Sequence, residues 1–143
     1  MANLDLELSL RQYVPWTIKK TLQERDLEFP FLIPKTDMVD YILPELESDP
    51  FKPIKASDML NGNVRLKVLD LDTDVTYPMG LSQLRVDNMP GNYYLRDYWA
   101  QLMQDRQLQE GDVIGLYWDR SNHQFCFSVI SLVQPRRSRA RDS

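Results

Sequence analysis

The chain has 143 residues, 43% of them hydrophobic and 27% charged, which is usual for one globular domain. No apolar run is long enough to span a bilayer and no secretory signal peptide is recognisable, so we expect a cytosolic or nuclear protein. The single cysteine, Cys126, excludes an internal disulfide. The sequence has no nucleophile motif, phosphate loop or metal-ligand spacing, so we expect neither an enzyme nor a cofactor.

The charge is divided unevenly along the chain. The net charge is −4, from 17 basic and 21 acidic residues, but residues 135–143 carry four arginines and one aspartate. Without this tail, 13 basic and 20 acidic residues remain, a net charge of −7. A domain that grips DNA phosphates normally shows the opposite balance or a local basic face. The acidity therefore favours modest binding to nucleic acid, if any.

The first third of the chain predicts two strands and a helix. Trp16 to Leu22 reads as a strand, Gln23 to Glu28 as a polar loop, and Phe29 to Pro34 as a short edge strand broken by prolines. Thr36 is placed to cap a helix that runs to Leu43 and is stopped by Pro44.

The middle of the chain predicts strands joined by turns. Residues 45–55 read as a surface loop, and Asn61-Gly62 is a hairpin signal. Residues 63–71 alternate between apolar and polar side chains, as in a half-buried strand. A turn at Asp72–Asp74, a strand or pair of strands over Val75–Val86, and a loop over Asp87–Asn92 follow.

The last third predicts one helix and a final hairpin. After a short strand over residues 93–95, Asp97 is placed to cap a helix whose apolar stripe includes Trp99, Leu102 and Met103. A turn at residues 109–112 precedes strands over 113–118 and 125–133. About seven short strands with two short helices are typical of a barrel or sandwich.

Several motifs, in this order, resemble the plant B3 domain family. Lys20-Thr21-Leu22 and Ile33-Pro34-Lys35 resemble the ends of its first two strands. Trp99-x-x-Leu102-Met103, followed by Leu108-x-x-Gly111-Asp112, resembles its second helix and the turn after it in both residue type and spacing. The stretches 15–20 and 114–119 are similar to a branch of small single-domain B3 proteins. The resemblance covers about residues 15–133.

This resemblance implies a mainly β fold: a seven-stranded open β-barrel, the DNA-binding pseudobarrel, with two short helices. The expected divisions are a leucine-rich peptide (1–14), the barrel (15–134) and a basic tail (135–143). In the family, two arms straddle the DNA major groove. Carried over, the first arm is Gln23–Glu28 and the second is Gln83–Asn92. The implied DNA-binding residues are Lys20, Gln23, Arg25, Lys35, Gln83, Arg85, Asn88 and Asn92.

The first arm departs from the family pattern, because QERDLE carries three acids and one arginine. Carboxylates that face phosphates repel them, so any DNA binding should be modest and salt-sensitive. Arg25 and Arg85 can equally be solvated surface arginines, and Lys20 and Lys35 can be solvated strand ends. The sequence therefore leaves open whether DNA binding survives.

The N-terminal Leu4-Asp5-Leu6-Glu7-Leu8-Ser9-Leu10 alternates with period two. It resembles the LxLxL repression motif of plant nuclear regulators, which implies that Leu4, Leu6, Leu8 and Leu10 bind a Topless-type co-repressor as an extended peptide. An extra strand covering the barrel is the alternative. The tail arginines can serve nuclear import or contact phosphate, or can simply be solvated.

Other candidate residues have structural interpretations. Trp16, Trp99 and Trp118 are expected in the core, Cys126 in a packed strand and His123 in an exposed turn. The aspartates at 70, 72 and 74 lack the rest of a calcium loop and predict a solvated turn. Two functions follow: a nuclear B3-type DNA-binding regulator, expected to be a repressor, or a protein-interaction module on a B3 scaffold that has lost sequence-specific DNA binding.

Overall fold

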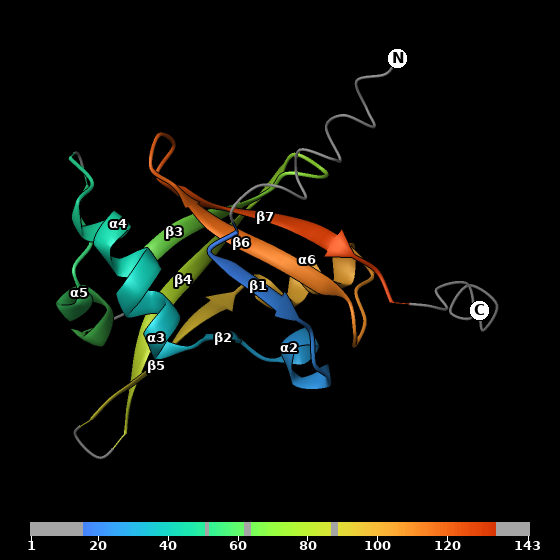
Figure 1. The fold of residues 1–143 in the computed structure, drawn as a ribbon, viewed down its shortest axis with the longest axis horizontal. Helices are drawn as coiled ribbons and strands as arrows, with labels where there is room; N and C mark the ends of the chain where they lie inside the picture. The colour runs from blue at the N-terminus through green and yellow to red at the C-terminus, as the bar shows by residue number, and fades with distance from the viewer. Residues whose placement is uncertain (1–15, 51, 62–63, 87–88, 134–143) are drawn as a thin grey trace.

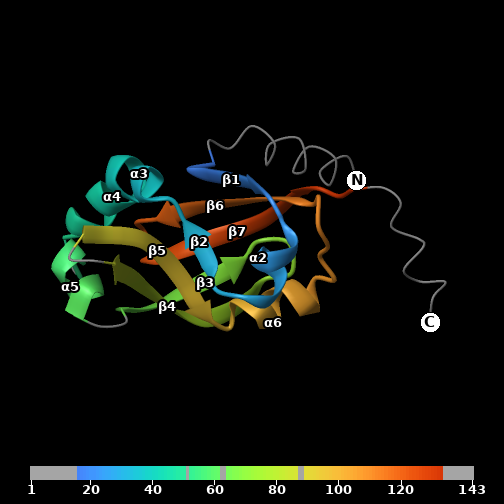
Figure 2. The same ribbon diagram turned by 90° about the horizontal axis from the view of Figure 1, so that it is seen from below.

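The computed structural model describes residues 16–50, 52–61, 64–86 and 89–133. Seven strands form one curled sheet in the order β1-β6-β7-β3-β4-β5-β2, as Figures 1 and 2 show. The strands are β1 (Ile18–Thr21), β2 (Phe31–Ile33), β3 (Val64–Asp70), β4 (Val75–Val86), β5 (Met89–Asp97), β6 (Val113–Asp119) and β7 (Gln124–Ser131). The mainly β fold with seven strands that the sequence predicts is confirmed.

The sheet pairs antiparallel except where β3 meets β7, which run parallel with Val68 opposite Phe125. The edge strands β1 and β2 stand at opposite ends of the strand order, so the barrel is open between them. Gly115 in β6 leaves room for the half-buried ring of Trp16, because a Cβ there would lie 2.5 Å from that ring. A small residue is therefore needed where the Trp16 ring lies on β6.

Short helices cover the two ends of the barrel (Figure 1). They are α2 (Glu24–Glu28), α3 (Lys35–Asp37), the π-helical turn η1 (Met38–Ile42), α4 (Leu43–Glu47), α5 (Ala56–Asn61) and α6 (Trp99–Asp105). In both ribbon views α3, α4 and α5 gather at one end and α2 and α6 at the other. No helix in the described part of the chain is long and apolar enough to cross a membrane.

The core lies inside the curl of the sheet and under these helices. Trp99 stacks on Phe31 at 4.4 Å between ring centroids and meets Phe127 edge-on at 6.2 Å. The predicted stripe of α6 is confirmed, since Trp99, Leu102 and Met103 are all buried. Cys126 is buried in β7 as expected, and burial raises the pKa of its thiol, which keeps it protonated.

Several local predictions were wrong at element boundaries. Residues 24–28 form a helix where a loop was expected. The helical stretch begins at Lys35 and continues past Pro44, which stands at the start of α4 directly after the π-helical turn. Asn61 ends helix α5, so the Asn61-Gly62 signal does not join two strands.

Near the second helix, the predicted cap was also misplaced. Tyr98 is the N-cap of α6, and Asp97 adopts a left-handed backbone with φ 74°. The Asp97 carboxylate instead accepts a hydrogen bond from Arg65 at 2.8 Å. The loop expected over Asp87–Asn92 is largely strand, because β5 begins at Met89. The second arm is therefore the end of a β4–β5 hairpin.

The turn predicted at Asp72–Asp74 is present, but Asp70 and Asp72 belong to an ion-pair network and are not simply solvated. Asp70 is fully buried, and its two carboxylate oxygens accept hydrogen bonds from Arg106 at 2.6 and 2.7 Å. Asp72 accepts from Arg106 and from Ser128. Among the described residues, no group of three or more His, Cys, Asp or Glu side chains could hold a metal. These aspartates bind the end of α6 to β3 and β7.

Candidate nucleic-acid interface

The first arm is held against the barrel by the buried side chain and backbone of Asp26. Its carboxylate accepts a hydrogen bond from the backbone N–H of Gln23 at 2.8 Å, as in a capping box, and starts helix α2. Its backbone carbonyl accepts a hydrogen bond from the Trp99 indole at 2.8 Å. Asp26 is 1% exposed. One of the three acids in the arm therefore serves the fold and does not face solvent.

Lys20 neutralises this buried carboxylate. Its ammonium lies 3.1 Å from Asp26 Oδ1 and 5.2 Å from the centroid of the Phe31 ring. A lysine that is committed to a buried acid is a poor phosphate contact, because moving it would leave that acid unpaired. The structure thus places Lys20 beside the first arm as a support for it.

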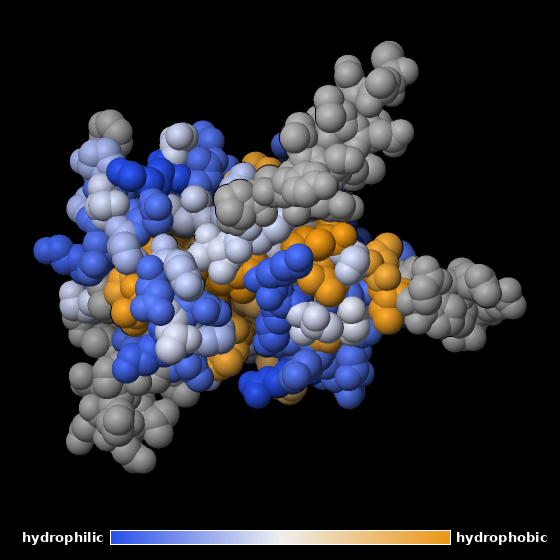
Figure 3. Space-filling view, in the orientation of Figure 1, coloured by the Kyte–Doolittle hydropathy of each residue, from blue (hydrophilic) through white to orange (hydrophobic). Residues whose placement is uncertain are grey.

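The outer side of α2 is exposed and mixed in charge. Gln23 and Arg25, two predicted DNA contacts, are both exposed there. They share a shallow hollow of about 460 Å³ with Phe29 and with the carboxylates of Glu24, Glu28 and Glu110. Figure 3 shows a mostly hydrophilic surface broken by small apolar areas. The arm therefore offers one guanidinium and one amide within an acidic surrounding.

The second arm is the outer part of the β4–β5 hairpin. Gln83 lies opposite Tyr93, and the pairing register shifts between Gln83 and Arg85, which lies opposite Pro90. Gln83 is only 8% exposed. A side chain that reads bases must be accessible to solvent in the free protein, and Gln83 is not. The side chain of Arg85 and the whole of Asn88 lie outside the described residues, so their predicted roles remain predictions.

Asn92 and Lys35 are brought together by the fold. The Asn92 side-chain oxygen accepts a hydrogen bond from the backbone N–H of Lys35 at 3.2 Å. This bond satisfies an N–H at the start of α3 and ties the second arm to the segment after β2. Both side chains are exposed. This bond uses one lone pair of the Asn92 oxygen, so it does not by itself prevent a base contact by that side chain.

The two arms lie on the same side of the barrel. In Figure 1 both α2 and the β4–β5 hairpin project from the lower side of the molecule. Figure 2, which views that side directly, shows β2 running between β5 and α2. Among the predicted residues, Gln23 and Arg25 belong to the first arm, Lys20 contacts that arm through Asp26, and Lys35 is bonded to Asn92 of the second arm. Leu4, Leu6, Leu8 and Leu10 lie outside the described residues.

Two supporting residues of this site were missed by sequence reasoning. Asp26 and Trp99 fix the first arm, but the former was counted among repelling acids and the latter only as core. The spacing Gln23-x-x-Asp26 was an available signal, since a side-chain acceptor three residues after a polar cap residue is the capping-box pattern. The contact between Trp99 and Asp26 spans 73 residues and carries no local signal.

A seven-stranded open barrel with a helical arm and a hairpin arm on one side defines a B3-type pseudobarrel. Comparison with known proteins bears this out: residues 16–130 match the family described as "B3 domain-containing protein At5g26805, C-terminal domain". The chain belongs to the B3 domain-containing family.

Relatives and solved structures agree with this membership. B3 domain-containing protein At1g10455 of Arabidopsis thaliana is 37% identical over 131 residues, covering 87% of this chain and 79% of the relative. Putative B3 domain-containing protein At1g51970 of the same plant is 32% identical over 131 residues, covering 90% and 97%. The fold is similar to that in the Arabidopsis FUS3–DNA complex, with a TM-score of 0.59 and 17% identity over 82% of this chain and 99% of that one.

Proposed function

We propose that this chain is a nuclear B3-type DNA-binding transcriptional regulator that contacts the DNA major groove through its two arms. The observation that carries the proposal is the placement of α2 and the β4–β5 hairpin on one side of a B3 barrel, with β2 between them. A duplex laid against β2 would be flanked by both arms. The FUS3 and LEC2 proteins, solved in complex with DNA, have a similar fold, which supports DNA as the partner.

The contacts that the chain can offer are few. Exposed Arg25 and Gln23 supply a guanidinium and an amide from the first arm, and both groups can read base edges in the major groove. Exposed Lys35 supplies one more cation on the same side. Because Asp26 is buried and paired with Lys20, only Glu24 and Glu28 of the arm's acids repel phosphate. We expect modest affinity that falls steeply with salt.

The test is selection from a random duplex library with the full chain at low and at physiological salt. Affinity for an enriched sequence should fall about fivefold or more in Arg25→Ala and in Arg85→Ala, since each base-edge contact is worth about 1–3 kcal/mol. Arg96→Ala is the matched control, because Arg96 is exposed on β5 near its base and away from the hairpin end. Affinity unchanged in both arm variants would contradict the placement of the interface.

Repression is proposed to come from the N-terminal leucines. An extended LDLELSL segment presents alternate leucines to the pockets of a Topless-type co-repressor. Replacing Leu6 and Leu8 by Ala should abolish capture of that co-repressor and leave the melting temperature of the protein unchanged. A large fall in melting temperature would instead show that these leucines form a structural strand.

A second candidate function is a protein-interaction module on the B3 scaffold. It is favoured by the hollow on α2, where the carboxylates of Glu24, Glu28 and Glu110 outnumber the single guanidinium of Arg25. Such a surface suits a basic nuclear protein. Two results together would support this second function. Selection at low salt should enrich no duplex, and a pull-down should recover a protein that binds the parent but not the Glu24→Lys, Glu28→Lys variant.

A further inference from the structure

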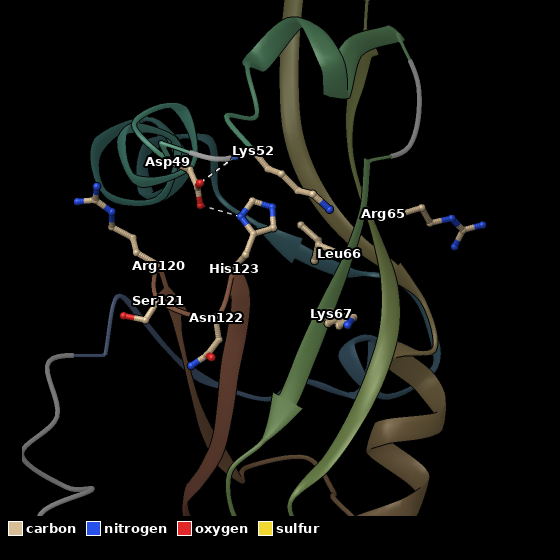
Figure 4. Close-up of a pocket in the computed structure, with 9 residues that line it drawn as sticks. All are labelled: Asp49, Lys52, Arg65, Leu66, Lys67, Arg120, Ser121, Asn122 and His123. Carbon is tan, nitrogen blue, oxygen red and sulfur yellow. Dashed lines mark hydrogen bonds and ion pairs between the residues drawn. The ribbon is translucent and has the colours of Figure 1, made fainter.

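A second charged hollow lies away from the two arms. It encloses about 370 Å³ between the loop after α4, strand β3 and the turn between β6 and β7 (Figure 4). We call it the basic pocket, defined by its four permanent cations Lys52, Arg65, Lys67 and Arg120. In Figure 1 the β6–β7 turn stands on the upper side of the barrel, whereas the arms project from the lower side. A single duplex bound between the arms would not reach this pocket.

The cations of the basic pocket are only partly compensated. Lys52 and Lys67 have no ion pair among the described residues. Arg65 is paired with Asp97 at 2.8 Å and Arg120 with Glu45 at 3.5 Å, and all four of these side chains are at least partly exposed. Exposed pairs of this kind contribute little stability, so a stronger anion can compete for the arginines. The pocket thus concentrates positive charge on a protein with a net charge of −4.

One buried carboxylate fixes the wall of the basic pocket through its hydrogen bonds. Asp49 accepts a hydrogen bond from the backbone N–H of Lys52 at 2.9 Å and contacts His123 Nδ1 at 2.7 Å. Because a carboxylate only accepts, His123 must donate from Nδ1. Both oxygens of Asp49 are therefore engaged, and the loop after α4 is tied to the β6–β7 turn. Figure 4 shows the Lys52 side chain passing beside His123 toward β3, while the guanidinium groups of Arg65 and Arg120 extend to opposite sides of the hollow.

We infer that the basic pocket binds a small ligand that carries two or more phosphate groups. Its volume falls at the lower end of the range of small-molecule sites, which suits a compact polyanion. Guanidinium forks and ammonium groups are the side chains that recognise phosphate, and Ser121 and Asn122 add neutral hydrogen-bonding groups to the lining. The four cations come from the loop after α4, from β3 and from the β6–β7 turn. A single phosphate group would contact only some of them.

Isothermal titration calorimetry with the full chain at physiological salt tests the inference. The probes are inorganic tripolyphosphate, inositol trisphosphate and ATP without divalent metal, which share clustered phosphates on different carriers. Citrate is the control for charge without phosphate. We expect at least one phosphate probe to bind with 1:1 stoichiometry and at least tenfold more tightly than citrate. The relative affinities of the three probes identify the carrier.

Two matched double variants separate the pocket from general electrostatic attraction. Lys52→Gln with Lys67→Gln should weaken binding of the best probe at least tenfold. Lys19→Gln with Lys55→Gln removes the same charge from exposed positions outside the pocket and should change it less than twofold. Equal losses in the two variants, or no binding of any probe, would overturn the inference. The inference would also be overturned if no phosphate probe binds and Lys52→Gln with Lys67→Gln loses affinity for duplex DNA. The pocket would then be a DNA contact.

Discussion

The two arms of the proposed interface are attached to the barrel in different ways. The first arm is a five-residue helix held by a buried carboxylate and by an indole hydrogen bond from α6. The second arm is a continuation of two paired strands, and the ladder shifts register where the hairpin leaves the barrel. Changes to the first arm should therefore act on folding as well as on binding, whereas changes near the hairpin end should act mainly on binding.

Helix α6 supports both arms from one side of the core. Its first residue, Trp99, donates to Asp26 of the first arm. Its last residue, Asp105, accepts a 2.6 Å hydrogen bond from Tyr77, at the base of the strand that carries the second arm. The same helix thus fixes the first arm by its buried beginning and the start of β4 by its exposed end. Because Trp99 is buried and Asp105 is exposed, replacing Trp99 should lower the unfolding free energy more than breaking the hydrogen bond to Asp105.

The largest effect is expected at Trp99. Trp99→Ala removes a ring that is 1% exposed and stacked on Phe31, so unfolding free energy should fall by about 3–5 kcal/mol. Trp99→Phe keeps most of the packing but leaves the Asp26 carbonyl without its indole donor, and should lose less. Chemical denaturation at neutral pH measures both. Equal losses in the two variants would mean that packing contributes little to this anchor.

A smaller effect is expected from the carboxylate of the first arm. Asp26→Ala removes the helix-starting hydrogen bond and leaves Lys20 unpaired, so unfolding free energy should fall by about 2 kcal/mol. Glu24→Ala, which removes an exposed acid from the same helix, is the control and should change the unfolding free energy by less than about 0.5 kcal/mol. If the two variants are equally stable, the buried carboxylate does not anchor the arm.

The base of the second arm should respond to alkaline pH. Burial, with the hydrogen bond to Asp105, raises the pKa of Tyr77 from 10.0 to about 12. Between these two pKa values the folded state keeps the Tyr77 proton while the unfolded state has lost it. The contribution of Tyr77 to the unfolding free energy is therefore fully present below pH 10 and is lost as the pH rises toward 12. Tyr77→Phe should lower stability by about 1 kcal/mol at pH 7 and make the alkaline decline shallower. Burial raises the pKa of Tyr117 to about 12 as well, so a residual decline should remain.

The slightest effect on stability is expected where the first arm faces solvent. Glu24→Gln with Glu28→Gln removes two exposed charges and should leave unfolding free energy within about 0.5 kcal/mol of the parent. Affinity for duplex DNA should rise roughly three- to tenfold at low salt, because repulsion of phosphate is reduced, and less at high salt. Fluorescence anisotropy at two salt concentrations measures this. Unchanged affinity at low salt would place the duplex away from α2.

Local sequence patterns predicted the strands well, because alternation reports directly which face of a strand is buried. Leu66 and Val68 are buried while Arg65 and Lys67 are exposed, as the alternation indicated. The helix boundaries were less predictable. Pro44 was read as a stop, but it occupies a first turn where proline is tolerated, after a π-helical turn that no local pattern announces.

The candidate site was predictable in position and less so in its electrostatics. The family resemblance placed both arms on segments that the fold brings to one side of the barrel. The burial of Asp26 and its pairing with Lys20 depend on where the first helix meets α6, a contact between segments far apart in sequence. The pairing of His123 with Asp49 is of the same kind, since 74 residues separate them; His123 lies in a turn as expected but is only partly exposed. Charge counts along a sequence cannot register such pairings.

The pairing of β1 with β6 has a consequence for how the barrel assembles. Ile18 lies opposite Leu116, so nearly the whole domain separates these partners along the chain. Domains dominated by distant pairings fold slowly, because the ends of a long loop must meet before the contacts form. During synthesis β1 leaves the ribosome before β6, so its backbone N–H and C=O groups lack their sheet partner until β6 has been made. A chain interrupted before β6 would expose that edge permanently, and aggregation would be its expected fate.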